Sequence, residues 1–464
     1  MFVGGETVWK LKKAVRLDFV DLTTTGRREA VLRRELDLNR RTAPALYRDV
    51  VPVRRTGEGL TLGGGAGEVV DWVLLMAPVP AGDFLEAMAA RGALTPDLLD
   101  AAADAVAAFH ATLPPAGPCD WPAALRRIAE GNTRAAMAAG LDRARIDAWM
   151  AATWREIAAR QDWLAARQQA GFVRRAHGDL HLGNLCLWEG RPVLIDALEF
   201  DEALGTVDLG YDLAFLLMDL DMRAGRPAAN RVLGRYVGRT GDAGLVAGLP
   251  LYLSQRAMVR AHVGAGRDGA SAAGYLDAAE AALHPAPGLV VAIGGLPGTG
   301  KTTLARAMAP GLGAAPGALV LRSDETRKRL FGRAPEERLG PEGYDAAANA
   351  RTDAALLTML RDAAASGQAV IVDATCLDPA FREAVEATAT AAGRGFLGLW
   401  LTARAAALEA RIAARRGDAS DATVDVLRRM RDPGPGTWRA VPADDAAAAL
   451  AAAQEYVKSA LAAC

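Results

Sequence analysis

Residues 295–302 read Gly-Leu-Pro-Gly-Thr-Gly-Lys-Thr, which fits the pattern G-x-x-x-x-G-K-T of a phosphate-binding loop. An apolar run at 289–293 precedes the loop and predicts a buried parallel strand, and the stretch 302–308 predicts a helix. In such a strand–loop–helix unit the glycines let backbone amides close around phosphate oxygens, and the helix N-terminus adds partial positive charge. The stretch therefore predicts nucleotide binding past the middle of the chain, against the alternative of an ordinary glycine-rich turn.

Two side chains of this Walker A pattern have specific expected roles. Lys301 is expected to reach the β- and γ-phosphates of ATP, and Thr302 is expected to ligate Mg²⁺. The residues that we expect to surround the nucleotide are consecutive in the chain: Gly295, Leu296, Pro297, Gly298, Thr299, Gly300, Lys301, Thr302 and Thr303.

The composition is that of a globular protein. The chain has 464 residues, of which 51% are hydrophobic and 23% charged, and this length predicts two or three domains. The formal net charge of −1 does not indicate nucleic-acid binding by bulk electrostatics, although a local basic groove stays possible. We find no charge-free apolar stretch of membrane-spanning length and no signal-peptide core at the N-terminus. The four cysteines are scattered without metal-binding spacing and predict free thiols in a reducing cytoplasm: Cys119, Cys186, Cys376 and Cys464.

A proline- and glycine-containing segment at 284–288 predicts the domain boundary, with one domain at 1–284 and another at 288–464. In the first domain we expect a strand at 7–15, a helix at 26–42, a strand at 72–76, and helices from 84 to 170 with a break near 114–122. Strands first and helices later predict a small β-rich lobe on a larger helical lobe.

A second candidate site lies at residues 177–184, which read His-Gly-Asp-Leu-His-Leu-Gly-Asn. Asp196 follows twelve residues after Asn184, at the end of a predicted strand. Carboxylate and amide oxygens suit Mg²⁺, and a carboxylate within hydrogen-bond reach can accept a proton from a hydroxyl. This arrangement resembles the catalytic set of protein kinases, in which one Asp orients the acceptor hydroxyl while Asn and a later Asp hold Mg²⁺. In these terms we expect Asp179 to act as the base and Asn184 and Asp196 to act as metal ligands; the alternative is that these polar residues cap a turn.

The variants Gly178 and Ile195-Asp196-Ala197 resemble the aminoglycoside phosphotransferase family and related small-molecule kinases rather than protein kinases. The resemblance covers about 1–284 and implies a kinase-like fold of two lobes. It also implies the roles given above for Asp179 and the two metal ligands, with His177 and His181 shaping the loop.

The small lobe has candidate partners for this site. Lys10 and Lys12 are two apart in the expected strand, and we expect one of them to contact the α- and β-phosphates and Glu35 to pair with it. A solvated basic strand and a solvated helix are the alternative. Kinase-like folds usually have a strand and a glycine-rich loop before the lysine strand, but only nine residues precede Lys10. We expect a hairpin at Gly4-Gly5 and a missing first strand, which leaves the nucleotide affinity of this domain open.

Other acidic residues follow in the first domain. Asp208 and Asp212 either support the site or cap a helix, and the cap is favoured. An aminoglycoside acceptor would require clustered acids because it is polycationic. The acids near the site are equally explained by metal binding and solvation: Asp196, Glu199, Asp201 and Glu202.

In the second domain, the segment 322–327 reads Arg-Ser-Asp-Glu-Thr-Arg after a predicted strand and resembles gluconate kinases and polynucleotide kinases. In those terms Asp324 is expected to accept the substrate proton, and Arg327 to hold an anionic group of the substrate. A strand at 369–372 ends in Asp373, which fits the Walker B position that supports Mg²⁺. The alternative for Asp324 and Arg327 is a helix-capping Asp with an exposed Arg. The alternative for Asp373 is a core strand that ends in a turn.

Arg411 and Arg415 stand four residues apart at helical spacing. An arginine pair on one helix face would suit a lid over the transferring phosphate, and an exposed, solvated helix is the alternative. The repeated strand–loop–helix order predicts a parallel sheet with helices on both faces. The fold class is therefore α/β for the second domain and α+β, kinase-like, for the first.

The whole chain resembles bacterial proteins that fuse an aminoglycoside phosphotransferase-like domain to an AAA-type, P-loop ATP-binding domain. The resemblance rests on VWKLKKAV, RRELDLNRR, HGDLHLGN, GLPGTGKTT, RSDETR and IVDATCLDP. The resemblance specifies the architecture but not the substrate. With the motifs above, we expect an ATP-dependent phosphotransferase that transfers the γ-phosphoryl group of Mg·ATP to a hydroxyl of a small molecule, such as a sugar or sugar acid, or of a polynucleotide end. Two alternatives remain: an ATPase that gates the first domain without an acceptor of its own, and a first domain that only binds a ligand or partner.

Overall fold

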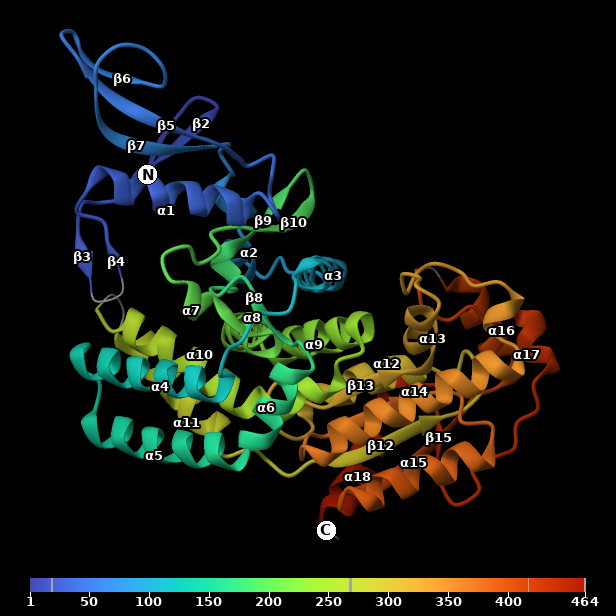
Figure 1. The fold of residues 1–464 in the computed structure, drawn as a ribbon. Coiled ribbons are helices and arrows are strands. Elements are labelled where there is room, and N and C mark those ends of the chain that lie inside the picture. The colour runs from blue at the N-terminus through green and yellow to red at the C-terminus, as the bar shows by residue number, and fades with distance from the viewer. Residues whose placement is uncertain (18–19, 267–268, 416, 463–464) are drawn as a thin grey trace. The chain divides into compact units, whose positions relative to one another are not determined.

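The computed structural model describes residues 1–17, 20–266, 269–415 and 417–462 (Figure 1), so Cys464 lies outside the described residues. The chain forms two compact units. The first unit comprises Met1–Ala224 and Gln255–Leu276, and the second comprises Gly225–Ser254 and Asp277–Cys464. Both units combine helices and strands, as the sequence predicts.

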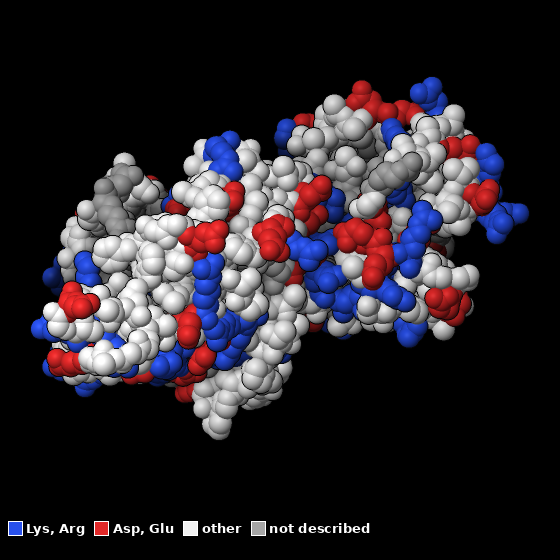
Figure 2. Space-filling model, turned by 90° about the horizontal axis from the view of Figure 1, so that it is seen from above, with Lys and Arg blue, Asp and Glu red and all other residues white. Residues whose placement is uncertain are grey.

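Charged side chains of both signs are interspersed over much of the face shown in Figure 2. This mixture agrees with the net charge of −1. Within the described ranges, every helix is too short or too polar to cross a bilayer.

The first unit begins with a five-stranded antiparallel sheet of order β1-β2-β7-β5-β6. Its strands are β1 (Phe2–Gly4), β2 (Thr7–Lys10), β5 (Tyr47–Thr56), β6 (Gly59–Leu62) and β7 (Glu68–Met76). The expected hairpin at Gly4-Gly5 is confirmed, because β1 and β2 pair directly across it. The expected strand at 7–15 is too long, since β2 ends at Lys10 and Lys12 lies beyond it.

One long helix packs on this sheet. It is α1 (Thr25–Asn39), which begins where the Thr24 side chain accepts a hydrogen bond from the Arg27 amide. Apolar residues of α1 meet those of β5 and β7 in a buried cluster that includes Leu32, Leu36 and Leu74. The packing fixes the helix that carries Glu35 against the sheet that carries Lys10.

Helices make up most of the rest of the first unit. They are α2 (Leu85–Ala90), α3 (Pro96–Thr112), α4 (Trp121–Ala138), α5 (Arg143–Ala159), α6 (Gln161–Gln169), α7 (Glu202–Gly205) and α8 (Leu209–Ala224). Three strand pairs accompany them: β3 (Arg16–Leu17) with β4 (Val20–Asp21), β8 (Val173–Arg175) with β11 (Thr206–Asp208), and β9 (Leu185–Trp188) with β10 (Arg191–Leu194). The predicted break near 114–122 is confirmed between α3 and α4. Two boundaries between the units fall inside helices. One lies after Ser254 in α10 (Leu249–Gly264), and the other lies after Leu276 in α11 (Gly269–Ala282).

The second unit contains a parallel five-stranded sheet of order β13-β14-β12-β15-β16. Its strands are β12 (Leu289–Gly294), β13 (Leu319–Arg322), β14 (Val370–Asp373), β15 (Gly395–Thr402) and β16 (Arg439–Pro442). Its helices after β12 are α12 (Lys301–Met308), α13 (Ser323–Leu330), α14 (Ala346–Ala365), α15 (Pro379–Ala391), α16 (Ala405–Ala414), α17 (Val424–Arg429) and α18 (Ala446–Ala462). The predicted parallel sheet, its first three strands and the helix after the glycine loop are confirmed.

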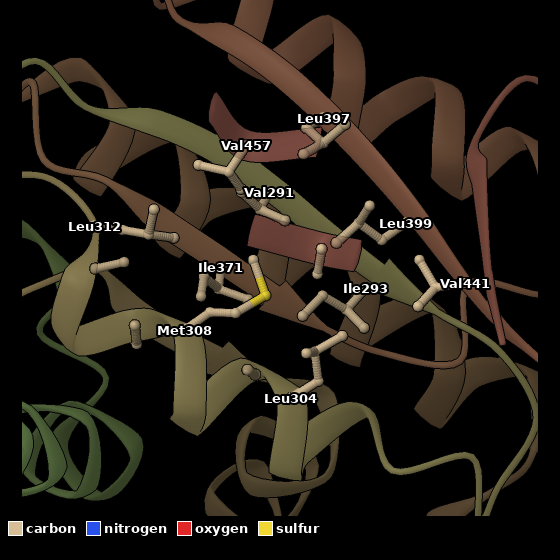
Figure 3. Close-up of a cluster of buried hydrophobic side chains, with 14 of the residues drawn as sticks. Val291, Ile293, Leu304, Met308, Leu312, Ile371, Leu397, Leu399, Val441 and Val457 are labelled. Carbon is tan, nitrogen blue, oxygen red and sulfur yellow. The ribbon is translucent and has the colours of Figure 1, made fainter. Parts of the chain in front are cut away.

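Side chains alternate between the two faces of this sheet. Val291, Ile293 and Ile371 point to the face covered by α12 and α18, where they form a buried apolar cluster with Leu304 and Val457 (Figure 3). Helices α14 and α15 pack against the other face. The strands are therefore buried on both sides, which explains their nearly continuous apolar sequences.

The edge strand β13 is covered by α9 (Arg226–Thr240), which the sequence assigned to the first domain. The Asn230 side chain donates a hydrogen bond to the Ala318 carbonyl at 2.9 Å, and Arg235 forms an ion pair with Glu336 at 2.7 Å. Covering an edge strand is a tertiary requirement that turn signals do not encode. The two compact units therefore do not coincide with the predicted segments 1–284 and 288–464. The domain boundary at 284–288 stays a prediction.

We expect Ile371→Ala to destabilise the second unit by roughly 2–5 kcal/mol, because it removes buried methyl groups and leaves a cavity in the cluster of Figure 3. The matched control is Leu461→Ala on α18, whose residue is 43% exposed and should change stability by less than about 0.5 kcal/mol. Urea unfolding of the full chain checks both values. Equal effects of the two substitutions would contradict the assignment of Ile371 to the core.

Candidate functional sites

The glycine loop follows β12 and ends at the N-terminus of α12. Gly295 has φ +135°, and a Cβ there would lie 2.5 Å from the Leu401 carbonyl oxygen. Gly298 has φ +85°, and its Cβ would lie 2.8 Å from the Leu408 carbonyl oxygen. Only glycine fits both positions. The first amides of a helix have no acceptor within the helix, so the amides that open α12 are suited to an anion.

Three predicted site residues meet at the carboxyl ends of β12 and β14. The Thr302 hydroxyl donates a hydrogen bond to Asp373 Oδ2 at 2.6 Å, and Asp373 is 5% exposed. Lys301 Nζ donates to the carbonyls of Gly295 and Leu296 at 2.9 and 3.0 Å, so its ammonium lies over the loop itself. Burial lowers the pKa of Lys301, against the opposing charges of Asp373 and Asp324. Thr303 is exposed in the first turn of α12.

Asp324 and Arg327 lie in the first two turns of α13, directly after β13. Burial raises the pKa of the Asp324 carboxyl above its usual value, although the charge of Arg322 opposes the shift. Arg327 is buried, donates to the Gly343 carbonyl at 2.7 Å and lies over the Tyr344 ring. The charge of Asp373 also raises the pKa of Asp324, and the charge of Lys301 lowers it.

The expectation that Arg411 and Arg415 share one helix face is wrong. Helix α16 ends at Ala414, and Arg415 adopts an extended backbone conformation after it. Arg411 donates to the carbonyls of Gly298 and Ala443, which ties α16 to the glycine loop. Arg415 lines a polar cavity of about 310 Å³ together with Asp418 and Ser420.

Sequence reasoning missed Arg322, the residue that joins most of this site. Arg322 is 6% exposed and contacts Thr302, Glu325, Asp373 and Asp418. The sequence did contain a signal for this role. Arg322 and Asp373 each end a predicted strand of the same parallel sheet, so both side chains are expected at the same edge of that sheet. In the register of β13 with β14, Arg322 is the partner of Asp373.

In the first unit, the two lysines lie on either side of Glu35. Glu35 Oε1 and Oε2 each lie 2.6 Å from an ammonium, that of Lys10 and that of Lys12 respectively. Lys10 also pairs with Asp196 at 2.6 Å, and Lys12 pairs with Glu199 at 2.5 Å. Although β2 ends at Lys10, both lysines reach the same fully buried carboxylate.

The charges in this network act on one another, and at its centre burial raises the pKa of Glu35 although the charges of Lys10 and Lys12 oppose the shift. Burial alone would lower the pKa of Lys10, but the charges of Asp196 and Glu35 raise it above its usual value. Burial raises the pKa of Asp196, but the charge and hydrogen bond of Lys10 lower it more, so the net shift is downward. Asp196 also has φ +58°, an uncommon conformation for a residue other than glycine and one that is frequent at functional sites.

Asp179 and Asn184 lie together in the loop at 177–184. The Asn184 amide nitrogen donates to Asp179 Oδ2 at 3.0 Å and to the Asp179 carbonyl at 2.8 Å. His181 Nε2 lies 3.5 Å from Asp179 Oδ2. Burial raises the pKa of Asp179, but the hydrogen bond and charge of His181 lower it more, so the carboxyl is ionised well below neutral pH.

His177 links this loop to the strand before Asp196. Its Nε2 lies 2.9 Å from the Ile195 carbonyl, and its Nδ1 accepts a hydrogen bond from the Asp179 amide at 3.3 Å. Burial lowers the pKa of His177, so the neutral tautomer with a proton on Nε2 fits both contacts. The expectation that histidines shape the loop agrees with these contacts.

Two buried carboxylates on α8 accept hydrogen bonds from backbone amides of the loop at 177–184. Asp212 accepts hydrogen bonds from the amides of His177 and Gly178 at 3.1 and 2.8 Å, so it supports the loop rather than capping a helix. Asp219, which the sequence analysis did not identify, accepts from the Leu182 amide at 3.1 Å. Asp208 does act as a cap, since it accepts from the Gly210 amide. The seven-residue spacing of Asp212 and Asp219 on one helix was the available signal.

The comparisons with known proteins match two separate segments of the chain. Residues 15–246 match the phosphotransferase enzyme family, and residues 290–433 match an AAA domain. Uncharacterized proteins of Mycobacterium tuberculosis and Mycobacterium bovis are 30% identical over 450 residues, covering 92% of this chain and 87% of theirs. The chain belongs to the phosphotransferase enzyme family. In this phosphotransferase-family protein an AAA domain follows the family segment.

Among solved structures, the aminoglycoside 2′-phosphotransferase-IIIa in its GDP complex is 15% identical with a TM-score of 0.33, covering 61% of this chain and 88% of that chain. A gluconokinase from Sinorhizobium meliloti is 20% identical with a TM-score of 0.25, covering 38% and 94%. The APS kinase of Mycobacterium tuberculosis, in complex with AMPPNP and APS, is 18% identical with a TM-score of 0.26, covering 37% and 97%. Similarities this low do not say what the present protein binds.

Replacing Glu35 by glutamine tests the charge network of the first unit. We expect Glu35→Gln to lower the free energy of unfolding by about 3–5 kcal/mol, because it leaves two buried ammonium groups without their shared carboxylate. Glu29→Gln on the same helix removes an exposed pair with Arg33 and should cost at most about 0.5 kcal/mol. Urea unfolding of both variants checks the difference, and a Glu35→Gln variant as stable as Glu29→Gln would show that the network contributes nothing.

Proposed function

We propose that this protein is an ATP-dependent phosphotransferase whose second unit transfers the γ-phosphoryl group of Mg·ATP to a hydroxyl. The acceptor is a small molecule, such as a sugar or sugar acid, or a polynucleotide end. The observation that carries the proposal is the Thr302–Asp373 hydrogen bond beside Lys301 at the carboxyl ends of two parallel strands. The match of residues 290–433 to an AAA domain supports this proposal for the second unit, and the phosphotransferase family match at residues 15–246 supports a phosphotransferase site in the first unit.

The residues at this site fit Mg·ATP. Mg²⁺ prefers oxygen ligands and is usually held by one or two carboxylates together with substrate phosphates and water. Among the described residues no three His, Cys, Asp or Glu side chains form a ready metal cage, in keeping with a site that has Thr302 and the single carboxylate Asp373. When bound, Mg²⁺ would neutralise phosphate charge. Lys301 and the amides at the start of α12 would hold the phosphates in place.

The remaining residues supply the acceptor side. Asp324 would accept the hydroxyl proton, and its raised pKa brings it closer to neutral pH, where a base is more effective. Arg327 would hold an anionic group of the acceptor, and Arg415 would contribute positive charge beside the transferring phosphate. Little covalent chemistry is required of these side chains, because positioning and charge neutralisation account for most of the rate.

The first unit would have a second phosphotransferase site. Asp179 would act as its base, and Asn184 and Asp196 would hold Mg²⁺. Lys10, positioned by Glu35, would contact the α- and β-phosphates. Asn184 uses its amide nitrogen to hold Asp179, so its amide oxygen is the atom suited to a metal.

The pKa of Asp324 gives a pH prediction. Asp324 must be ionised to accept a proton, so kcat/KM of the second unit should fall as the pH drops through a value above about 3.9, the usual pKa of Asp. A pH profile of labelled-product formation measures this acidic limb. ATP binding, measured over the same pH range as a control, should not show it. A limb at or below the usual pKa would count against Asp324 as the base.

Phosphoryl transfer from γ-labelled ATP to a fractionated pool of metabolites and oligonucleotides tests the function itself. Lys301→Met should abolish the product of the second unit, whereas Lys458→Met, on the exposed face of α18, should leave it unchanged. Asp179→Asn should lower the product of the first unit by about 10²–10⁴-fold, the usual contribution of a general base.

The pattern of products separates the candidate functions. If Lys301→Met and Asp179→Asn remove different products, both units transfer phosphate. If only Lys301→Met has an effect, the first unit binds without transferring. If the wild type releases phosphate and labels no acceptor, the kinase proposal fails and an ATPase that gates the first unit is favoured.

A further inference from the structure

Arg322 lies at the centre of a buried cluster in the second unit. Its Nε donates to Asp373 Oδ2 at 3.3 Å, and its Nη2 donates to the Thr302 hydroxyl oxygen at 3.2 Å. Its Nη1 donates to Glu325 Oε1 at 2.6 Å, and Nη2 also donates to Asp418 Oδ1 at 3.3 Å. All three nitrogens of the guanidinium are therefore engaged, and its charge is shared among three carboxylates.

Two of these partners are the oxygens that we assign to Mg²⁺. Asp373 Oδ2 accepts hydrogen bonds from both Thr302 and Arg322, so the hydroxyl, the carboxylate and the guanidinium contact one another. The parallel register of β13 and β14 places Arg322 beside Asp373. A cation held this close to metal ligands competes electrostatically with a metal for the same oxygens.

The other two partners hold the guanidinium from outside the metal ligands. Glu325 is on the first turn of α13 and is 6% exposed. Asp418 belongs to the segment 417–421, and its carboxylate also accepts a hydrogen bond from the Ser420 amide at 2.9 Å. This segment is attached a second time, because Asp421 pairs with the buried Lys328 at 2.7 Å. Asp418 thus connects the polar cavity to the glycine loop through one arginine.

We infer that Arg322 is a positioning residue that holds Thr302 and Asp373 in place and sets how readily these oxygens accept Mg²⁺, with Asp418 drawing the guanidinium away from them. This inference rests on the proposed function of the second unit. Asp418 lies outside the predicted catalytic residues. In this inference it affects the Mg²⁺ concentration that the site requires to bind ATP.

Arg322 and Asp418 variants should then shift the metal requirement in opposite directions. Arg322→Gln removes a competing cation and should lower the Mg²⁺ concentration for half-maximal ATP binding on the order of tenfold, while reducing kcat because Asp373 loses its support. Asp418→Asn should raise that Mg²⁺ concentration, because the guanidinium then binds Thr302 and Asp373 more closely. In the double variant the larger part of the Asp418→Asn shift should disappear.

The measurement is ATP binding to the full chain by calorimetry at a series of Mg²⁺ concentrations, together with kcat for labelled product. The first unit contributes equally to every variant, so differences report the second unit. Arg382→Gln is the matched control: Arg382 is also buried, but it donates to the carbonyls of Cys376, Gly434 and Pro435, and its loss should not lower the Mg²⁺ requirement. Arg322→Lys keeps the charge and should keep a Mg²⁺ requirement near that of the wild type.

A parallel Lys301→Met variant separates failure of the role of Arg322 from failure of the proposed function. If Lys301→Met abolishes ATP binding to the second unit but Arg322→Gln raises the Mg²⁺ requirement or leaves it unchanged, the role of Arg322 is overturned and the proposed function stands. A full Asp418→Asn shift in the double variant would overturn it equally. If Lys301→Met changes neither binding nor transfer, the proposed function fails first. Should Arg322→Gln not fold, Asp418→Asn and Arg322→Lys carry the test.

Discussion

The parallel pairing of β12 with β14 is the constraint on which the second unit depends. It aligns Ile293 with Asp373 across the sheet, so the glycine loop after one strand and the carboxylate ending the next open at the same edge. The Thr302 hydroxyl can then reach Asp373, and the adjacent pairing of β13 brings Arg322 to the same carboxylate. An apolar core on one face and two helices on the other hold this register, because a slip would turn apolar side chains away from the core.

The first unit reaches a comparable arrangement by different means. Its loop at 177–184 has little regular structure, and buried carboxylates of α8 hold its amides instead. Burial of Asp212 costs free energy unless the charge is compensated, and here two loop amides and His110 provide the compensation. The hydrogen bond and charge of His110 outweigh burial and lower the pKa of Asp212 to about 2. Side-chain carboxylates of α8 thus position the loop that carries Asp179.

The sequence predicts those parts of the two sites that lie in short contiguous motifs. The glycine loop and the strand ending in Asp373 could be found because glycine, lysine and apolar residues follow a fixed local spacing. The contacts of Arg322 could not, since they join residues 51 and 96 positions apart and depend on strand order. Tertiary contacts, which local propensity does not predict, also decide three other features. These are the packing of α9 on β13, the end of β2 at Lys10 and the end of α16 at Ala414.

We propose that each unit has its own nucleotide site, built around Lys301 in one and Lys10 in the other. Equilibrium binding of radiolabelled ATP to the full chain, with Mg²⁺ present, measures the number of these sites. We predict two bound nucleotides per wild-type chain, one for Lys301→Met, one for Lys10→Met, and none for the double variant. A wild-type chain that binds a single nucleotide, lost in Lys301→Met and kept in Lys10→Met, would contradict the claim and leave the first unit without a nucleotide site.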